Sequence, residues 1–231
     1  MPTVEEEFQT LWDEKLADEL ADERSRGYSP ERFYHSGRKS KLWPEGEGPA
    51  WWFEHGPAFV KSWARWRELS ELRFWTAPDG APGIELPVRA FEPGCDCELY
   101  CVIDRVMVDA SGALYIIDLK SGSHQDAWPR QIALNNLGLM ATYGVRARFG
   151  GFWSARKGAV VPMFDLRTYD DAWMWDQVHR ARLIRDNELF VAQPTNLCNS
   201  ACGVRDYCKA VGGSLSMTVP QQSHSTSEEA E

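Results

Sequence analysis

The chain lacks any apolar stretch as long as the roughly 18 residues that a membrane-spanning helix requires, so we expect no membrane protein. It also lacks the pattern of a secretory signal peptide. We therefore expect a cytoplasmic protein, whose six cysteines are thiols or metal ligands rather than disulfide partners. No internal repeat is evident, and 231 residues suit one large domain or one domain with appendages.

Excess positive charge is also lacking, since the formal net charge is −9. Phosphate contacts dominate affinity for nucleic acids, so an acidic chain is an unfavourable DNA-binding protein. The excess of negative charge is local, however, because residues 1–23 hold nine acidic residues and one lysine. Residues 24–67 and 120–160 each carry a net charge of +5. DNA binding by these two segments stays possible, and the acidic segment is either a solvated helix face or a protein-binding surface.

Apolar residues are plentiful, at 43% with 11 tryptophans, so the chain can bury a sizeable core. Helical periodicity predicts an acidic amphipathic helix within residues 1–27, with an apolar face made of Val4, Phe8, Leu11, Leu16 and Leu20. Further helices are expected at 57–70, at 126–143, and from a cap at Thr168 to about 188. Strands are expected near 83–90, 98–108, 113–120, 146–155 and 159–165. The polar residues 211–231 are predicted to be disordered.

Two of the predicted strands are each interrupted by a carboxylate. Asp104 and Asp118 both lie within apolar runs, although Asp is disfavoured inside strands. Between them, residues 110–112 suit a three-residue hairpin loop with Gly112 in the left-handed conformation. This loop pairs residues whose numbers sum to 222, so Asp104 is predicted to face Asp118.

Strand alternation then places Lys120 on the same face as Asp118. Facing carboxylates repel each other unless positive charge lies between them, so a divalent cation beside Lys120 is the favoured occupant. The alternative is a pair of strand-end acids, with Lys120 as a surface counter-charge.

The motifs Asp104, Asp118-Leu119-Lys120 and Gln131 resemble those of the PD-(D/E)XK nucleases, in particular the RecB-type exonuclease branch. That branch includes CRISPR-associated adaptation nucleases and phage recombination exonucleases. The resemblance implies an α/β fold, a restriction-endonuclease-like core whose central mixed β-sheet is flanked by helices. The nuclease domain would span residues 28–210, and the helix within residues 1–27 would form a helical N-terminal cover.

The resemblance also implies roles for these residues. Asp104, Asp118 and the backbone carbonyl of Leu119 would bind Mg²⁺ or Mn²⁺, which polarises the phosphate and lowers the pKa of a bound water. Oxygen ligands suit these ions better than zinc. Lys120 would orient the water or stabilise transition-state charge. Gln131 would reach the site or the DNA backbone, or is an ordinary polar residue of a first helical turn. Glu85 is a further metal ligand or a solvated strand residue.

Three cysteines near the C-terminus, Cys198, Cys202 and Cys208, resemble part of the iron–sulfur staple of these nucleases. They would hold a [4Fe–4S] cluster or Zn²⁺. The family takes its fourth cysteine from the N-terminal side, where this chain has Ser36. A replacement ligand can come from His35, Cys95, Cys97 or Cys101, or else the three thiols are ordinary free or buried residues.

A second departure from the RecB-type pattern concerns its Gly-x-x-x-His helix. Gly56 matches the glycine, but Val60 stands where the histidine is expected, and His55 is out of frame. The departure weakens an exonuclease assignment more than a nuclease assignment. Trp43, Trp51 and Trp52 lie in the first basic segment, and they either stack on unpaired bases or pack in the core.

Together these patterns predict a Mg²⁺- or Mn²⁺-dependent deoxyribonuclease, an exonuclease rather than an endonuclease. It would act on DNA in recombination, repair or phage replication, in a bacterial or phage-infected cell. One alternative is a catalytically silent nuclease fold that binds DNA or a protein partner, the latter through the acidic N-terminal helix. Another is a cysteine–zinc interaction module.

Overall fold

The computed structural model describes residues 2–25, 46–92, 98–122, 129–187 and 208. The chain divides into two compact units, Met1–Leu189 and Phe190–Glu231, and the elements given below belong to the first. Several residues of the predicted cysteine site, namely His35, Cys95, Cys97, Cys198 and Cys202, lie outside the described residues. No helix of the described ranges is long and apolar enough to cross a membrane.

The first unit is built on one mixed sheet. Its described strands are β1 Arg73–Phe74, β2 Ile84–Phe91, β3 Glu98–Val108, β4 Leu114–Lys120, β5 Phe149–Ser154 and β6 Ala159–Asp165. The order across the sheet is β1-β3-β4-β5-β6, with β2 also paired to β3. The pair β4–β5 is parallel and the other pairs are antiparallel. The predicted central mixed sheet is therefore confirmed.

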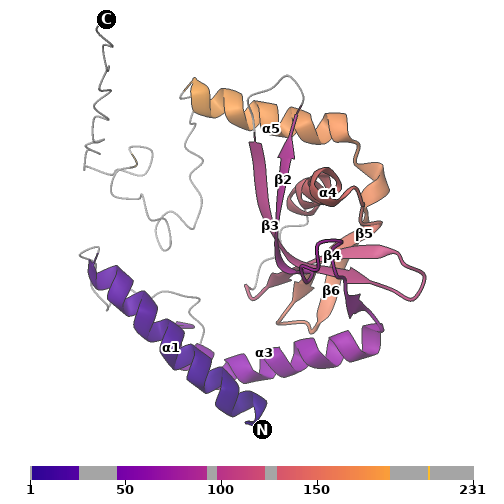
Figure 1. Ribbon diagram of the computed structural model, residues 1–231. Helices are drawn as coiled ribbons and strands as arrows, with labels where there is room; N and C mark the ends of the chain where they lie inside the picture. Colours follow the sequence, from indigo (N-terminus) through magenta and orange to yellow (C-terminus); the bar gives the residue numbers. More distant parts are fainter. Residues whose placement is uncertain (1, 26–45, 93–97, 123–128, 188–207, 209–231) are drawn as a thin grey trace, which may run out of the picture. The chain divides into compact units, whose positions relative to one another are not determined.

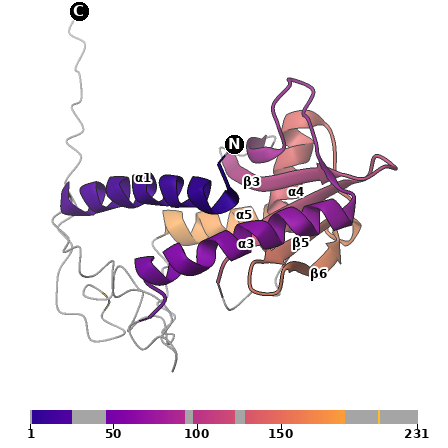
Figure 2. The ribbon, with the colours of Figure 1, turned by 90° about the horizontal axis from the view of Figure 1, so that it is seen from below.

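Helices cover both faces of this sheet (Figures 1 and 2). They are α1 Val4–Ser25, α3 Pro49–Ser70, α4 Arg130–Tyr143 and α5 Asp171–Asp186. Phe59, Trp63 and Trp66 of α3 pack on Met107, Ile117 and Trp153 on one face. On the opposite face α4 covers the largest core cluster, which includes Ile103, Val106 and Ile116. Helix α5 packs against α4, and α1 contacts α3.

The hairpin of β3 and β4 has the predicted register. Its paired residues run from Val108 with Leu114 to Arg105 with Ile117, and the residue numbers of each pair sum to 222. The amide of Asp109 donates to the carbonyl of Ala113 at 3.1 Å. Gly112 has a φ of 87°, a conformation that glycine adopts without steric cost. The prediction of the loop and its pairing is confirmed.

The predicted helix over 57–70 begins eight residues too late. Helix α3 starts at Pro49, because proline fits the first helical turn, where its missing N–H is not needed. Pro57 lies buried inside the helix instead of opening it. The two-residue strand β1 was not expected.

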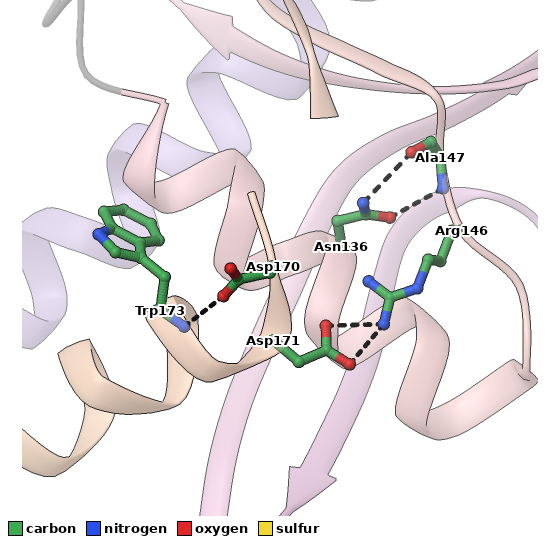
Figure 3. A network of polar contacts seen from close by, with 6 residues as sticks. All are labelled: Asn136, Arg146, Ala147, Asp170, Asp171 and Trp173. Carbon is green, nitrogen blue, oxygen red and sulfur yellow. Dashed lines mark hydrogen bonds and ion pairs between the residues drawn. The ribbon is translucent and has the colours of Figure 1, made fainter. Parts of the chain in front are cut away.

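The predicted cap of the last helix is also wrong. Thr168 Oγ1 donates to the carbonyl of Asp165 at 2.8 Å, within the 3₁₀ turn Leu166–Thr168. The N-cap of α5 is Asp170, whose carboxylate accepts the amide of Trp173 at 2.7 Å (Figure 3). The side-chain oxygen of Asp caps a helix as well as that of Thr does, so Asp170, which directly precedes the helix, is the N-cap residue.

Helix α1 approaches α3 closely at Gly56. A Cβ added there would lie 2.0 Å from the ring atom Cζ of Phe8, so the contact depends on glycine. Lys61 of α3 also pairs with Glu5 of α1. The face of α1 that is half-buried consists of Phe8, Trp12, Leu16 and Leu20, whereas Val4 and Leu11 are exposed. A spacing of four residues therefore describes the packed face better than the predicted set.

A polar network joins α4 to the segments that follow it (Figure 3). The amide group of buried Asn136 donates to the carbonyl of Ala147 at 3.2 Å and accepts its N–H at 2.8 Å. Next to it, Arg146 makes two contacts with the carboxylate of Asp171, at 2.7 and 2.6 Å. Because a buried amide without partners is costly, this pairing fixes α4 beside the approach to β5. The network thereby anchors the helix that carries Gln131.

Candidate active site

Asp118 is an almost fully buried carboxylate near the end of β4, with only 2% of its surface exposed. Its Oδ1 accepts a hydrogen bond from Gln131 Nε2 at 2.7 Å. Its Oδ2 lies 2.6 Å from Lys120 Nζ. Lys120 Nζ also donates to Gln131 Oε1 at 3.3 Å. The structure thus brings Asp118, Lys120 and Gln131 into one closed set of contacts.

The pKa of Asp118 is raised above its usual value, chiefly because burial disfavours the charged form. The contact with Lys120 opposes this shift, and the nearby charge of Asp104 adds to it. Oδ2 makes a charge–charge contact with Lys120 but no well-formed hydrogen bond within the described part of the chain. An ionised Asp118 is therefore incompletely compensated, and its Oδ2 is the atom best placed to accept a cation.

Asp104 lies on the neighbouring strand and is held by the same segment of β4. Its Oδ2 accepts the backbone N–H of Leu119 at 2.8 Å, just beyond the pair Arg105–Ile117 at the end of the β3–β4 ladder. The alternation of β3 also breaks here, since Ile103 and Val106 both pack in the cluster under α4 although they are three residues apart. This break sets the Asp104 carboxylate beside β4.

Glu85 does not join the two aspartates. It lies on β2 between two residues that pair with Arg105 and Ile103, so it is next to Asp104 in the sheet. Its φ of 48° is left-handed, and its carboxylate contacts Arg105 Nη1 at 2.9 Å. Among the residues that the structure describes, no group of three or more His, Cys, Asp or Glu side chains is arranged to hold a metal ion.

The donor set that remains fits a hard divalent cation. Mg²⁺ is commonly held by one or two carboxylates and completes its shell with water and substrate oxygens. Asp104 and Asp118 are carboxylates of neighbouring strands, and the carbonyl of Leu119 follows directly after Asp118. The observation that favours such an ion is the buried Oδ2 of Asp118, whose polar contact in the described residues is the ammonium of Lys120.

The other predicted residues lie as follows. His55 Nδ1 is 2.9 Å from the carbonyl of Trp51, and the two rings stack at 4.3 Å. Cys101, a candidate for the fourth ligand, is half-buried and packs against the core cluster under α4, and burial raises its pKa. Cys208 is half-buried, and neither cysteine forms a disulfide with a described residue. Trp51 is buried, with 7% exposed, so it belongs to the core.

One feature of the site was not expected from the sequence. A cavity of about 480 Å³ lies between α1, α3 and the end of β4, where it reaches Leu119 and Lys120. Val60 and Trp52 are among its lining residues. The pattern of aromatic residues at helical spacing in residues 49–66 was the available signal, but it indicates a core equally well.

Arg156 fastens the end of β4 to α3. Its guanidinium forms two contacts with Glu47, at 3.1 and 2.5 Å, and its Nε donates to the carbonyl of Ser121 at 3.1 Å. It also lies 5.0 Å from the ring centre of Trp51, in cation–π geometry. Arg156 contributes to the positive charge of residues 120–160, a segment considered above for DNA binding. Its contacts, however, are with other residues of the protein. It positions the residue that follows Lys120.

The family model of the PD-(D/E)XK nuclease superfamily matches residues 4–209. A search of the curated proteins found no significant match. The matched range contains Asp104, Asp118, Lys120 and Gln131 and every described strand of the sheet. Members of this superfamily are in general metal-dependent nucleases that act on DNA. The chain belongs to the PD-(D/E)XK nuclease superfamily.

Proposed function

We propose that this protein is a Mg²⁺- or Mn²⁺-dependent deoxyribonuclease whose active site consists of Asp104, Asp118, Lys120 and Gln131. Asp104, Asp118 and the carbonyl of Leu119 hold the cation. The observation that carries the proposal is Asp118 itself, a buried carboxylate with a raised pKa that lies between Lys120 and Gln131. An aspartate with no functional role would not require such an arrangement, because an apolar residue at the same position would destabilise the fold less than a buried charge does.

The bound cation supplies charge that polarises the scissile phosphate and makes a water more acidic. The chain's own residues organise the rest. Gln131 holds Oδ1 of Asp118, which leaves Oδ2 for the ion, and the Leu119 amide holds Oδ2 of Asp104. Lys120 is the counter-ion of Asp118 in this structure. Lys120 would also stabilise the extra negative charge that develops at the phosphate in the transition state.

We propose further that the enzyme is an exonuclease of recombination, repair or phage replication. The resemblance of the motifs to the RecB-type branch supports the exonuclease assignment, whereas Val60 at the position of the expected histidine weakens it. The test is cleavage of end-labelled linear and closed circular DNA with Mg²⁺ or Mn²⁺. An exonuclease degrades the linear molecule only. Cleavage of both forms makes the protein an endonuclease, and cleavage of neither favours a silent nuclease fold.

The cysteine segment is proposed, from its spacing alone, to hold a [4Fe–4S] cluster or Zn²⁺. Protein purified without oxygen should then contain stoichiometric iron and sulfide, or about one zinc, and Cys208→Ser should release the metal. Metal-free protein that is folded and active would show that these thiols are ordinary residues.

A further inference from the structure

The cavity beside Lys120 is lined mainly by flat aromatic side chains from three elements. Phe8 and Trp12 come from α1, Trp52, Phe59 and Trp63 come from α3, and Trp153 comes from β5. All except Trp153 are half-buried rather than buried. Val60, with 42% of its surface exposed, adds a further apolar wall. These surfaces keep part of their area accessible, unlike side chains that serve the core alone.

We propose that this cavity binds an unpaired nucleobase of the DNA strand that is cut, so that the substrate class is single-stranded DNA or DNA with an unpaired end. This inference rests on the nuclease function proposed above. The residues described so far would contact the phosphate and the cation, and the cavity would contact the base.

The first argument is continuity with the proposed active site. Leu119, Lys120 and Ser121 line the cavity at the end of β4. The amide of Leu119 holds Asp104, and the ammonium of Lys120 contacts Asp118. The end of β4 therefore borders both the cavity, which lies on the α3 side of the sheet, and the Asp118 carboxylate, which meets Gln131 of α4.

The second argument is complementary chemistry. Aromatic side chains bind bases by stacking, and this works for every base because each has a π-face. Bases within a duplex are already stacked and cannot offer their faces, so an aromatic cavity selects unpaired nucleotides. Lys120, which is among the lining residues, carries a positive charge that suits the backbone phosphate of the same nucleotide. An apolar peptide would match the aromatic walls but not this cation.

The third argument is that the walls are held in place. Gly56 allows the ring of Phe8 to rest on α3, and Lys61 pairs with Glu5 across the same contact. Arg156 lies 6.0 Å from the ring centre of Trp52 and 5.8 Å from that of Phe59, while it binds the carbonyl of Ser121. A stacking surface that is ordered in advance loses less entropy when it binds a base.

The test measures DNA binding in an Asp118→Asn background, where cleavage cannot interfere. Labelled single strands, duplexes with a short overhang and blunt duplexes are titrated at one salt concentration. Trp12→Leu and Trp52→Leu should each weaken binding of the single strand and the overhang by about 5- to 100-fold, the range of one lost base stack. Blunt-duplex binding should stay unchanged. Trp52→Phe should restore most of the affinity, because it keeps an aromatic face.

Trp173→Leu is the matched control, since Trp173 is a partly exposed tryptophan of α5 that does not line the cavity. Oligonucleotides with a single abasic position provide a second readout. One position near the end should weaken binding of the unsubstituted protein, and it should have little further effect in Trp52→Leu. Folded variants that bind all three DNA forms like the control would overturn the proposal, as would an equal loss on blunt duplexes.

Cleavage by the unsubstituted protein is recorded separately. Base-dependent binding without any cleavage means that the nuclease proposal has failed and the base-binding cavity stands. Cleavage that is indifferent to Trp52→Leu and to every abasic position means that the base-binding proposal has failed and the nuclease proposal stands.

Discussion

At the scale of single residues, Asp118 explains most of what is unusual about this chain. Its carboxylate is buried in a sheet whose buried side chains are mostly apolar, and Lys120 and Gln131 are its polar contacts in the described residues. Burial of a charge costs stability unless partners compensate it. The site therefore accepts an unfavourable ionised group, as expected where a cation is to be held.

Asp118→Asn should raise the free energy of unfolding of the metal-free protein near neutral pH, by about 1 kcal/mol, a typical single-residue effect. The pKa of Asp118 is raised in the folded state above its ordinary value of 3.8, so its contribution to stability is present below 3.8 and lost as pH rises through the folded pKa. The difference between the variant and the unsubstituted protein should vanish at low pH. Urea unfolding between pH 8 and pH 3, with a chelator, measures this difference.

Asp109→Asn is the opposite case and serves as the control. The hydrogen bond from Ser111 is the main reason that the pKa of Asp109 is lowered. Its contribution is present above the ordinary value and lost as pH falls through the folded pKa, so this substitution should destabilise the protein near neutral pH. Equal pH profiles for the two variants would contradict the role of burial at Asp118.

Lys120→Ala should lower the rate of cleavage by on the order of 10²–10³, comparable with loss of one preorganised group that stabilises the transition state. Lys157→Ala is the control, because Lys157 is an exposed lysine of the same basic segment in the β5–β6 turn. Single-turnover rates with saturating protein separate this effect from weaker DNA binding. A rate for Lys120→Ala equal to that of Lys157→Ala would remove Lys120 from the mechanism.

The register of the β3–β4 hairpin could be predicted from the sequence, because a three-residue loop fixes how the two strands pair. The contacts of Glu85 could not. Its left-handed φ and the break in alternation at Asp104 are tertiary effects, and they direct Arg105 toward Glu85 rather than into the site.

At the scale of elements, the contact between α1 and α3 depends on a single glycine. Gly56→Ala places a methyl group against the ring of Phe8, so we expect a loss of about 1–3 kcal/mol, typical of overpacking. Phe8→Ala combined with Gly56→Ala should cost no more than Phe8→Ala alone. Denaturant unfolding and limited proteolysis of α1 measure both effects. Full additivity of the two substitutions would show that the contact is not the cause.

Elements with a clear apolar periodicity could be predicted from the sequence, and elements without one could not. β3 and β4 form as strands and α1 forms as a helix where their patterns predicted them, although Val4 and Leu11 of α1 are exposed. The start of α3 was missed because Pro57 signals a helix start, although Pro49 fits the same position and buried Trp51 lies in the first turn that Pro49 opens. β1 has two residues, too few for any period to be visible.

At the scale of the whole molecule, charge is divided between segments. Arg146 and Arg156 pair with Asp171 and Glu47, so the second basic segment offers DNA less charge than its composition indicates. Trp12 and Phe8 of the acidic helix line the cavity, so removal of that helix would damage more than a repulsive surface. Composition alone could not show these ion pairs or the role of α1 in the cavity, because both depend on which residues come into contact in the fold.

Neutralising the exposed acids of α1, with Asp13→Asn, Glu14→Gln, Asp18→Asn and Glu19→Gln together, should tighten non-specific DNA binding and leave the cavity intact. The logarithm of affinity should fall with the logarithm of salt concentration, with a slope of about −0.9 per neutralised phosphate on a duplex. Anisotropy titrations at several salt concentrations test this. An unchanged affinity would favour α1 as a protein-binding surface.

The central claim is that Asp118 holds the catalytic cation, and one measurement tests it most directly. End-labelled linear DNA is incubated with Mg²⁺ or Mn²⁺ and either the unsubstituted protein or Asp118→Asn, after both are shown to be folded. We expect cleavage by the unsubstituted protein that a chelator abolishes, and none by Asp118→Asn. Cleavage that persists in Asp118→Asn, or its absence from the folded unsubstituted protein with either metal, would contradict the account.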